Sequence, residues 1–151
     1  MCDVAILAVP DLNEAGFLEG LRTPLAGKIV ISPIVPMRME NGLLVYSKTS
    51  DSAAVEVASI LKESRVVAAL HHIPALTILK KNKKIDFDVL VACNSRGDYE
   101  VTSNLIRSVE GFRPLYVGPL SMARIVESIT PLLINSAKLN RLNRLSLKLV
   151  V

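Results

Sequence analysis

The sequence contains no tryptophan and only two cysteines, and no apolar run approaches the roughly 18 residues needed to cross a membrane. Cys2 and Cys93 match neither a zinc-binding spacing nor the dense disulfide framework of a small secreted domain. No basic segment precedes the first apolar run, as it would in a secretory signal. We therefore expect a protein of the reducing cytoplasm with no membrane partner.

Aromatic residues are also scarce, at 4% of a 151-residue chain of which 50% is hydrophobic. The interior must then be built from Val, Ile, Leu and Ala, which is typical of parallel sheets buried on both faces. A chain of this length can form a core without disulfides or a metal. These features predict one domain of the α/β class.

The sequence has only seven glycines, and none forms the G-x-G-x-x-G turn with which a Rossmann domain holds a dinucleotide pyrophosphate. A nucleophile with a matching base is also absent, which gives little support to hydrolysis. The net charge is +4, and its densest basic run spans residues 80–84. Such a run is typical of a solvated loop, with an acidic ligand or nucleic acid as alternatives. No aromatic residues interleave with it for base stacking, so a nucleic-acid partner is poorly supported.

Apolar runs of strand length alternate with segments of helical period along almost the whole chain. We predict strands at residues 4–9, 28–32, 65–70, 89–93 and 114–117, an extended stretch at 43–46 and an edge strand at 145–149. The first run has no polar alternation, so both its faces should be buried. We predict helices after an Asp11–Glu14 capping box, at 52–61, at 98–109 with a stripe of Val101, Leu105 and Val109, and at 119–139.

Proline or histidine stands where four of the predicted strands end: Val9-Pro10, Ser32-Pro33, His71-His72-Ile73-Pro74 and Gly118-Pro119. If the strands are parallel, these ends meet at one edge of the sheet, where open α/β folds bind ligands. Prolines there can form rigid apolar walls for a flat ring, or can simply end the strands. We expect one crevice at this edge.

His71 and His72 are the only histidines. Consecutive side chains of a strand point to opposite faces, so the pair is a poor metal chelate and we expect no metal site. Structural hydrogen bonding, contact with a cofactor ring or phosphate, and general acid/base work remain open for them.

The order of these motifs resembles the reduced coenzyme F-420:NADP oxidoreductases. The resemblance is carried by residues 3–10, 27–33 and 65–75, by Arg113-Pro114 and Gly118-Pro119-Leu120, and by Thr130-Pro131-Leu132-Leu133-Ile134-Asn135. It implies an incomplete Rossmann-like, doubly wound, mostly parallel sheet over residues 1–118. Residues 119–151 would form a long helix and terminal strand that complete the cofactor cleft as a small C-terminal lobe.

The resemblance also implies a role for particular residues in hydride transfer between reduced 5-deazaflavin and NADP, for which no protein base is needed. Val9 and Pro10 would lie near the nicotinamide, and Ser32, Pro33, Val35 and Pro36 would border the shared cleft. His71, His72, Ile73 and Pro74 would contact the deazaflavin, while Leu133 and Asn135 would close its far side.

Members of that family begin about three strands earlier, with the glycine-rich turn, so the resemblance implies a truncated chain that lacks its NADP-binding half. Residues 4–9 would then form an exposed apolar edge, which invites a homo-oligomer or a separate N-terminal Rossmann half. One alternative is a non-catalytic binding or assembly protein that uses this edge. Another is a truncated reductase acting on pyrroline-carboxylate, against which residues 130–135 argue.

Overall fold

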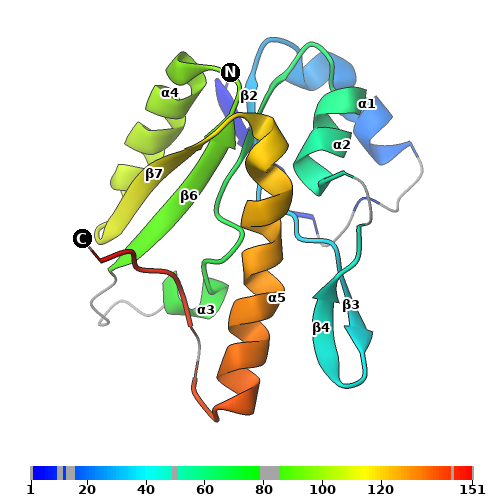
Figure 1. Ribbon diagram of the computed structural model, residues 1–151. Coiled ribbons are helices and arrows are strands. Elements are labelled where there is room, and N and C mark those ends of the chain that lie inside the picture. The colour runs from blue at the N-terminus through cyan, green and yellow to red at the C-terminus, as the bar shows by residue number, and fades with distance from the viewer. Residues whose placement is uncertain are drawn as a thin grey trace.

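Short apolar strands form the centre of the molecule in the computed structural model, which describes residues 2–9, 12, 16–48, 51–78, 86–143 and 145–150. The five-stranded sheet has the order β1-β2-β5-β6-β7 (Figure 1). Its strands are β1 (Val4–Ile6), β2 (Ile29–Ser32), β5 (Arg65–Ala68), β6 (Phe87–Cys93) and β7 (Phe112–Gly118). The five strands predicted for the central sheet are present, and the α/β class with a mostly parallel sheet is confirmed.

One strand pair runs against the prediction. β1, β2 and β5 are parallel, and β6 is parallel to β7, but β5 and β6 are antiparallel. A parallel crossover would carry the chain back to the start of β5. Here the chain makes only a short connection, in which the described helix is the four-residue α3 (Ala75–Ile78). β6 therefore begins beyond the end of β5 and runs back, so that only its last residues, Ala92 and Cys93, pair with β5. β7 therefore runs opposite to β5, so the chain leaves the sheet in opposite directions at Gly118-Pro119 and at His71, and the expectation that these strand ends share one edge was wrong.

Helices cover both faces of the sheet. Helices α1 (Phe17–Leu25) and α2 (Ala53–Ile60) pack on one face with the 3₁₀ turn η1 (Leu120–Met122) and the start of α5 (Ala123–Leu139), and α4 (Arg96–Arg107) packs on the other. Alternate residues of one strand serve the two cores, with Val30 in the first and Ile29 and Ile31 in the second. The sequence prediction of these helices was largely correct, although the Asp11–Glu14 capping box lies outside the described residues.

The predicted stripe on α4 was wrong. Val101 and Leu105 are 45% and 42% exposed, whereas the buried face carries Tyr99, Thr102, Ser103 and Ile106. These four residues have helical spacing, but two are polar, so a search for apolar periodicity finds the wrong face.

The extended stretch at 43–46 is one arm of a hairpin. β3 (Met37–Glu40) pairs antiparallel with β4 (Leu43–Tyr46), and β3 is exposed throughout. Asn41 and Gly42 form its turn with φ of 48° and 78°. Asn-Gly is the preferred pair for a two-residue turn that needs positive φ at both positions, and this signal identifies the hairpin in the sequence.

The two ends of the described chain differ from expectation. β1 is an edge strand, as the resemblance implied, but Ile6 is 51% exposed, so it is not buried on both faces. Residues 145–150 form no strand, although the Leu147 carbonyl accepts a hydrogen bond from the Asp88 N–H. Among the described residues, no helix is long and apolar enough to span a membrane.

Candidate functional site

A left-handed turn after β5 brings both histidines inward. Leu70 has a φ of 71°, and the Ile73 N–H donates a 3.3 Å hydrogen bond to the Leu70 carbonyl. Positive φ is costly for a residue with a large side chain and marks a constrained functional or structural position. His71 and His72 are 6% and 3% exposed. The sequence prediction assumed that both histidines lie in a strand, with their rings on opposite faces. The strand β5 ends at Ala68, before the two histidines.

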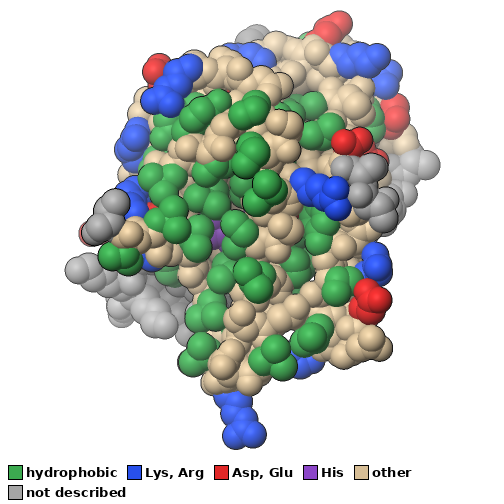
Figure 2. Space-filling view, in the orientation of Figure 1, with side chains coloured by type: hydrophobic (Ala, Val, Ile, Leu, Met, Phe, Trp, Pro, Cys, Tyr) green, Lys and Arg blue, Asp and Glu red, His purple; other side chains and the backbone are tan. Residues whose placement is uncertain are grey.

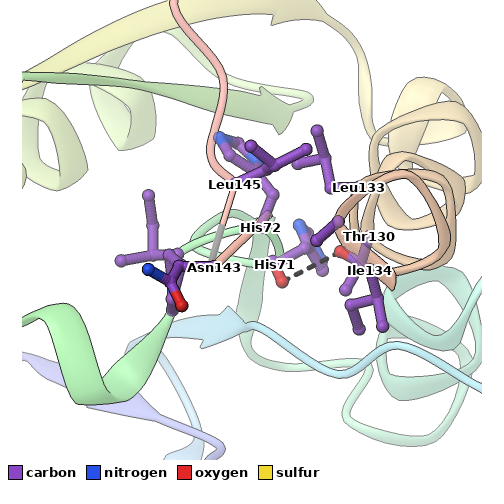
Figure 3. Close-up of a pocket in the computed structure, with 10 residues that line it drawn as sticks. His71, His72, Thr130, Leu133, Ile134, Asn143 and Leu145 are labelled. Atoms are coloured by element: carbon purple, nitrogen blue, oxygen red, sulfur yellow. Dashed lines mark hydrogen bonds between the residues drawn. The ribbon is translucent and has the colours of Figure 1, made fainter. Parts of the chain in front are cut away.

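Both histidines line a pocket of about 280 Å³ between this turn, helix α5 and the end of the chain (Figure 3). Of the site residues predicted from the sequence, the structure brings together His71, His72, Ile73, Pro74 and Leu133. The other lining residues are Thr130, Ile134, Ala137, Asn143 and Leu145. The Thr130 hydroxyl donates a 2.9 Å hydrogen bond to the His71 carbonyl and so joins α5 to the turn. Thr130, Leu133, Ile134 and Ala137 are spaced i, i+3, i+4 and i+7, a signal that could have found this helix face in the sequence.

The pocket is apolar, and its lining residues include no charged side chain. Hydrophobic side chains surround a small visible patch of histidine surface on this face of the molecule (Figure 2). Burial lowers the pKa of His71 to about 3, with His72 as a second cause, so the imidazole is neutral at physiological pH. A group with so low a pKa is a poor general acid or base near pH 7.

Three ring nitrogens of these histidines are buried and have no hydrogen-bond partner, although both residues line the pocket. Neither nitrogen of His71 makes a hydrogen bond of good geometry, although the Ser32 backbone lies close enough to oppose the lowering of its pKa. The His72 Nε2 lies 2.7 Å from the Asp88 carbonyl oxygen, which can only accept, so Nε2 carries the proton. The His72 Nδ1 is then an acceptor without a partner. Buried polar atoms usually have hydrogen-bond partners. These three unpartnered nitrogens therefore make the pocket a candidate site for a ligand or water.

The remaining predicted residues lie outside the pocket lining. Ser32 is fully buried at the end of β2, beside His71, and its hydroxyl has no partner. Pro33, Val35 and Pro36 are half-buried and lead from β2 into the hairpin. Val9 packs against the core at the same sheet edge, and Pro10 lies outside the described residues. This edge thus carries a second group of predicted residues, next to the pocket.

Asn135 holds the hairpin against α5. Its Oδ1 accepts a 2.9 Å hydrogen bond from the Leu44 N–H, and its Nδ2 donates a 2.7 Å bond to the Leu44 carbonyl. The Lys138 ammonium adds a 2.6 Å bond to the Gly42 carbonyl. Both polar atoms of the Asn135 side chain are therefore bonded to the hairpin, and Asn135 is not among the residues that line the pocket.

Replacing Asn135 by alanine should destabilise the protein by about 1–2 kcal/mol and speed amide exchange at Leu44, because two part-buried hydrogen bonds are lost. Hydrogen exchange followed by NMR measures the effect, with Asn140→Ala, at an exposed position near the end of the helix, as the control. Unchanged exchange at Leu44 would contradict the anchoring role.

Potential metal ligands are not clustered in the part of the chain that the structure describes. Among those residues, no three His, Cys, Asp or Glu side chains are grouped so that they could hold a metal ion. Cys93 is buried and Cys2 is exposed, and neither belongs to the pocket.

Comparison with known proteins decides the family. No family model matches the sequence. The chain is 34% identical to the F420-dependent NADP reductase of Methanothermobacter thermautotrophicus and 32% identical to that of Methanothermobacter marburgensis, each over 97% of this chain. It belongs to the F420-dependent NADP reductase family. The match covers 66% and 68% of these relatives, so the chain spans about two thirds of their length.

A solved structure agrees with this family on the fold. A candidate F420-dependent NADP reductase from Arthrobacter sp. FB24 superimposes on 99% of this chain and 70% of its own, with a TM-score of 0.85 and 18% identity. At that identity the likeness concerns the fold alone. Membership of the F420-dependent NADP reductase family does not favour the alternative of a non-catalytic assembly protein.

Proposed function

We propose that this chain binds coenzyme F-420 and takes part in hydride transfer between its 5-deazaflavin ring and NADP. The observation that carries the proposal is the apolar pocket in which His71, His72 and Leu133 meet. Its volume of about 280 Å³ is near the lower end for ligand sites, so it suits a ring system rather than a whole coenzyme. The relatives are named as F420-dependent NADP reductases, which supports the choice of ring.

The residues present fit a flat ring with a polar edge. Ile73, Pro74 and Leu133 offer apolar walls, and the unpartnered nitrogens of His71 and His72 offer hydrogen bonds. The bound deazaflavin supplies the hydride chemistry itself. The chain's own residues bind and orient the ring and exclude water, which is the main contribution of a protein to such a transfer.

The NADP side of the proposal involves the second group of residues. We propose that Val9, Pro10, Ser32, Pro33, Val35 and Pro36 border the nicotinamide at the adjoining edge of the sheet. Residues 1–118 would supply this Rossmann-like part, and residues 119–151 would complete the cleft through α5. Because these 151 residues contain no G-x-G-x-x-G, we propose that the pyrophosphate is held by a further Rossmann segment or a second subunit. The exposed Ile6 on edge strand β1 supports pairing there.

Titration of the protein with oxidised coenzyme F-420, followed by absorbance and fluorescence, tests the proposal. We expect saturable binding, and we expect Leu133→Trp to weaken it at least about tenfold by filling the pocket, which corresponds to about 1.4 kcal/mol. The matched control is Leu132→Trp, because Leu132 is adjacent on α5 but 63% exposed and absent from the pocket lining. Failure of the folded wild-type protein to bind, or equal binding by both variants, would contradict the proposal. NADPH-dependent bleaching would in addition show that the chain needs no further segment for turnover.

A further inference from the structure

The C-terminal segment fills a gap in the sheet. β5 and β6 pair only through Val67 with Cys93 and Ala68 with Ala92, so the first part of β6 has no partner in β5. At Asp88 the backbone carbonyl accepts from the His72 ring, and the N–H donates a 2.9 Å bond to the Leu147 carbonyl. Residues 145–149, which we call the strap, thus lie where β5 would have continued (Figure 1).

The Asp88 side chain fastens the far end of the strap. It is fully buried and accepts hydrogen bonds from Arg113 Nε at 2.6 Å, from Arg113 Nη2 at 2.7 Å and from the Leu149 N–H at 2.6 Å. Arg113 Nη2 also donates a 2.7 Å bond to the Leu149 carbonyl. A buried carboxylate is stable only with such partners, and here they belong to both β7 and the strap.

The near end of the strap forms part of the pocket. Leu145 lines the pocket, and the Ser146 hydroxyl lies 3.4 Å from the His72 carbonyl. Leu145 and His72 lie close together, with Leu133 of α5 nearby (Figure 3). Only three residues separate Leu145 from the fastened Leu149, so the position of Leu149 constrains where Leu145 can lie.

We propose that Asp88 and Arg113 are positioning residues for the pocket: by fastening the strap at Leu149 they hold Leu145 in place as a wall for the bound ring. The choice of ring rests on the proposed function, whereas the fastening of the strap does not. Neither side chain lines the pocket, so both act through the strap.

Asp88→Asn is the principal test variant, because it retains the shape of the side chain and loses the charge that Arg113 and Leu149 use. Asp86→Asn is the matched control. Asp86 also pairs with Lys148 of the strap, but it is 63% exposed, and among the described residues its side chain has no hydrogen bond to the strap backbone. We expect Asp88→Asn to speed amide exchange at Leu149 by at least about tenfold and to raise the Kd for coenzyme F-420 at least about fivefold, with less than about twofold change for Asp86→Asn.

Leu145→Ala separates strap positioning from a general loss of folding. It removes the pocket contact and leaves the fastening intact, so we expect weaker binding of the coenzyme with unchanged exchange at Leu149. Faster exchange in Asp88→Asn with wild-type affinity, or wild-type affinity in Leu145→Ala, would overturn the proposal.

If the wild-type protein does not bind coenzyme F-420, the proposed function fails and the strap is tested by other measurements. The dye anilinonaphthalene sulfonate then reports access to the apolar pocket, alongside exchange at Leu149. Increased dye fluorescence in folded Asp88→Asn, but not in Asp86→Asn, would support the fastening of the strap. Equal fluorescence in the two variants would overturn it.

Discussion

Replacing Glu127 by alanine should lower the free energy of unfolding by about 3–5 kcal/mol, because it removes a buried carboxylate that satisfies donors from two other elements. Glu127 is fully buried on α5. It accepts 3.0 Å hydrogen bonds from the N–H groups of Ala53 and Ala54 at the start of α2, and a 2.6 Å bond from the Tyr46 hydroxyl of β4. Three donors would lose their partner together.

The pKa of Glu127 depends on the same contacts. Burial raises the pKa of Glu127, while hydrogen bonds from Tyr46, Ala54 and Ala53 oppose that rise. Burial raises the pKa of Tyr46, and the hydrogen bond to Glu127 adds to it, so the phenol remains the donor. A carboxylate at the start of a helix is also favoured by the helix dipole.

Urea denaturation of the variant measures the loss as a lower midpoint with an unchanged slope. Tyr46→Phe is the matched comparison, since it removes one of the three donors and should cost only about 1–2 kcal/mol. If Glu127→Ala proved no less stable than Tyr46→Phe, the role of Glu127 as the common acceptor of α2 and the hairpin would be contradicted.

Lowering the pH from 7.5 to 5 should reduce the stability of the protein by about 2 kcal/mol through His71 alone, given an unfolded pKa of about 6.5. Burial depresses the pKa of His71 to about 3 in the folded state, so between about 6.5 and 3 the unfolded chain binds a proton that the folded chain does not. Stability is therefore complete above the unfolded pKa and is lost as the pH falls. The depressed pKa of His72, also caused first by burial, acts in the same direction.

Asp88 and Glu127 contribute to the pH dependence of stability in other ways than the histidines. Arg113 holds the pKa of Asp88 below its usual range, so that carboxylate matters only at lower pH. The raised pKa of Glu127 works in the opposite direction, because the folded state then takes up a proton earlier than the unfolded one. Comparing the wild-type protein with His71→Asn cancels both contributions.

Thermal or urea unfolding at a series of pH values provides the measurement. The His71→Asn variant should lose about 2 kcal/mol of the pH dependence that the wild-type protein shows between 7.5 and 5, and it should keep the part that comes from His72. Identical pH dependence in the two proteins would mean that His71 is not held neutral by burial.

Some of the site was accessible from the sequence because it depends on neighbours in the chain. His71, His72, Ile73 and Pro74 follow a recognisable apolar strand, and four of the pocket residues on α5 repeat at helical spacing. The Asn41-Gly42 turn was equally visible, and it identifies a hairpin of which only the second strand was predicted. Apolar periodicity failed on α4, where Thr102 and Ser103 occupy the buried face.

By itself the sequence determined the α/β class, the position of every strand in the central sheet and the resemblance to the family, since these depend on local patterns and motif order. The tertiary structure alone decided that β6 runs against β5, that the left-handed Leu70 turns both histidines inward, and that the strap supplies Leu145 to the pocket. Each of these rests on contacts between residues far apart in the chain, such as Asp88 with Leu149 and Thr130 with His71, whose energies no local pattern records.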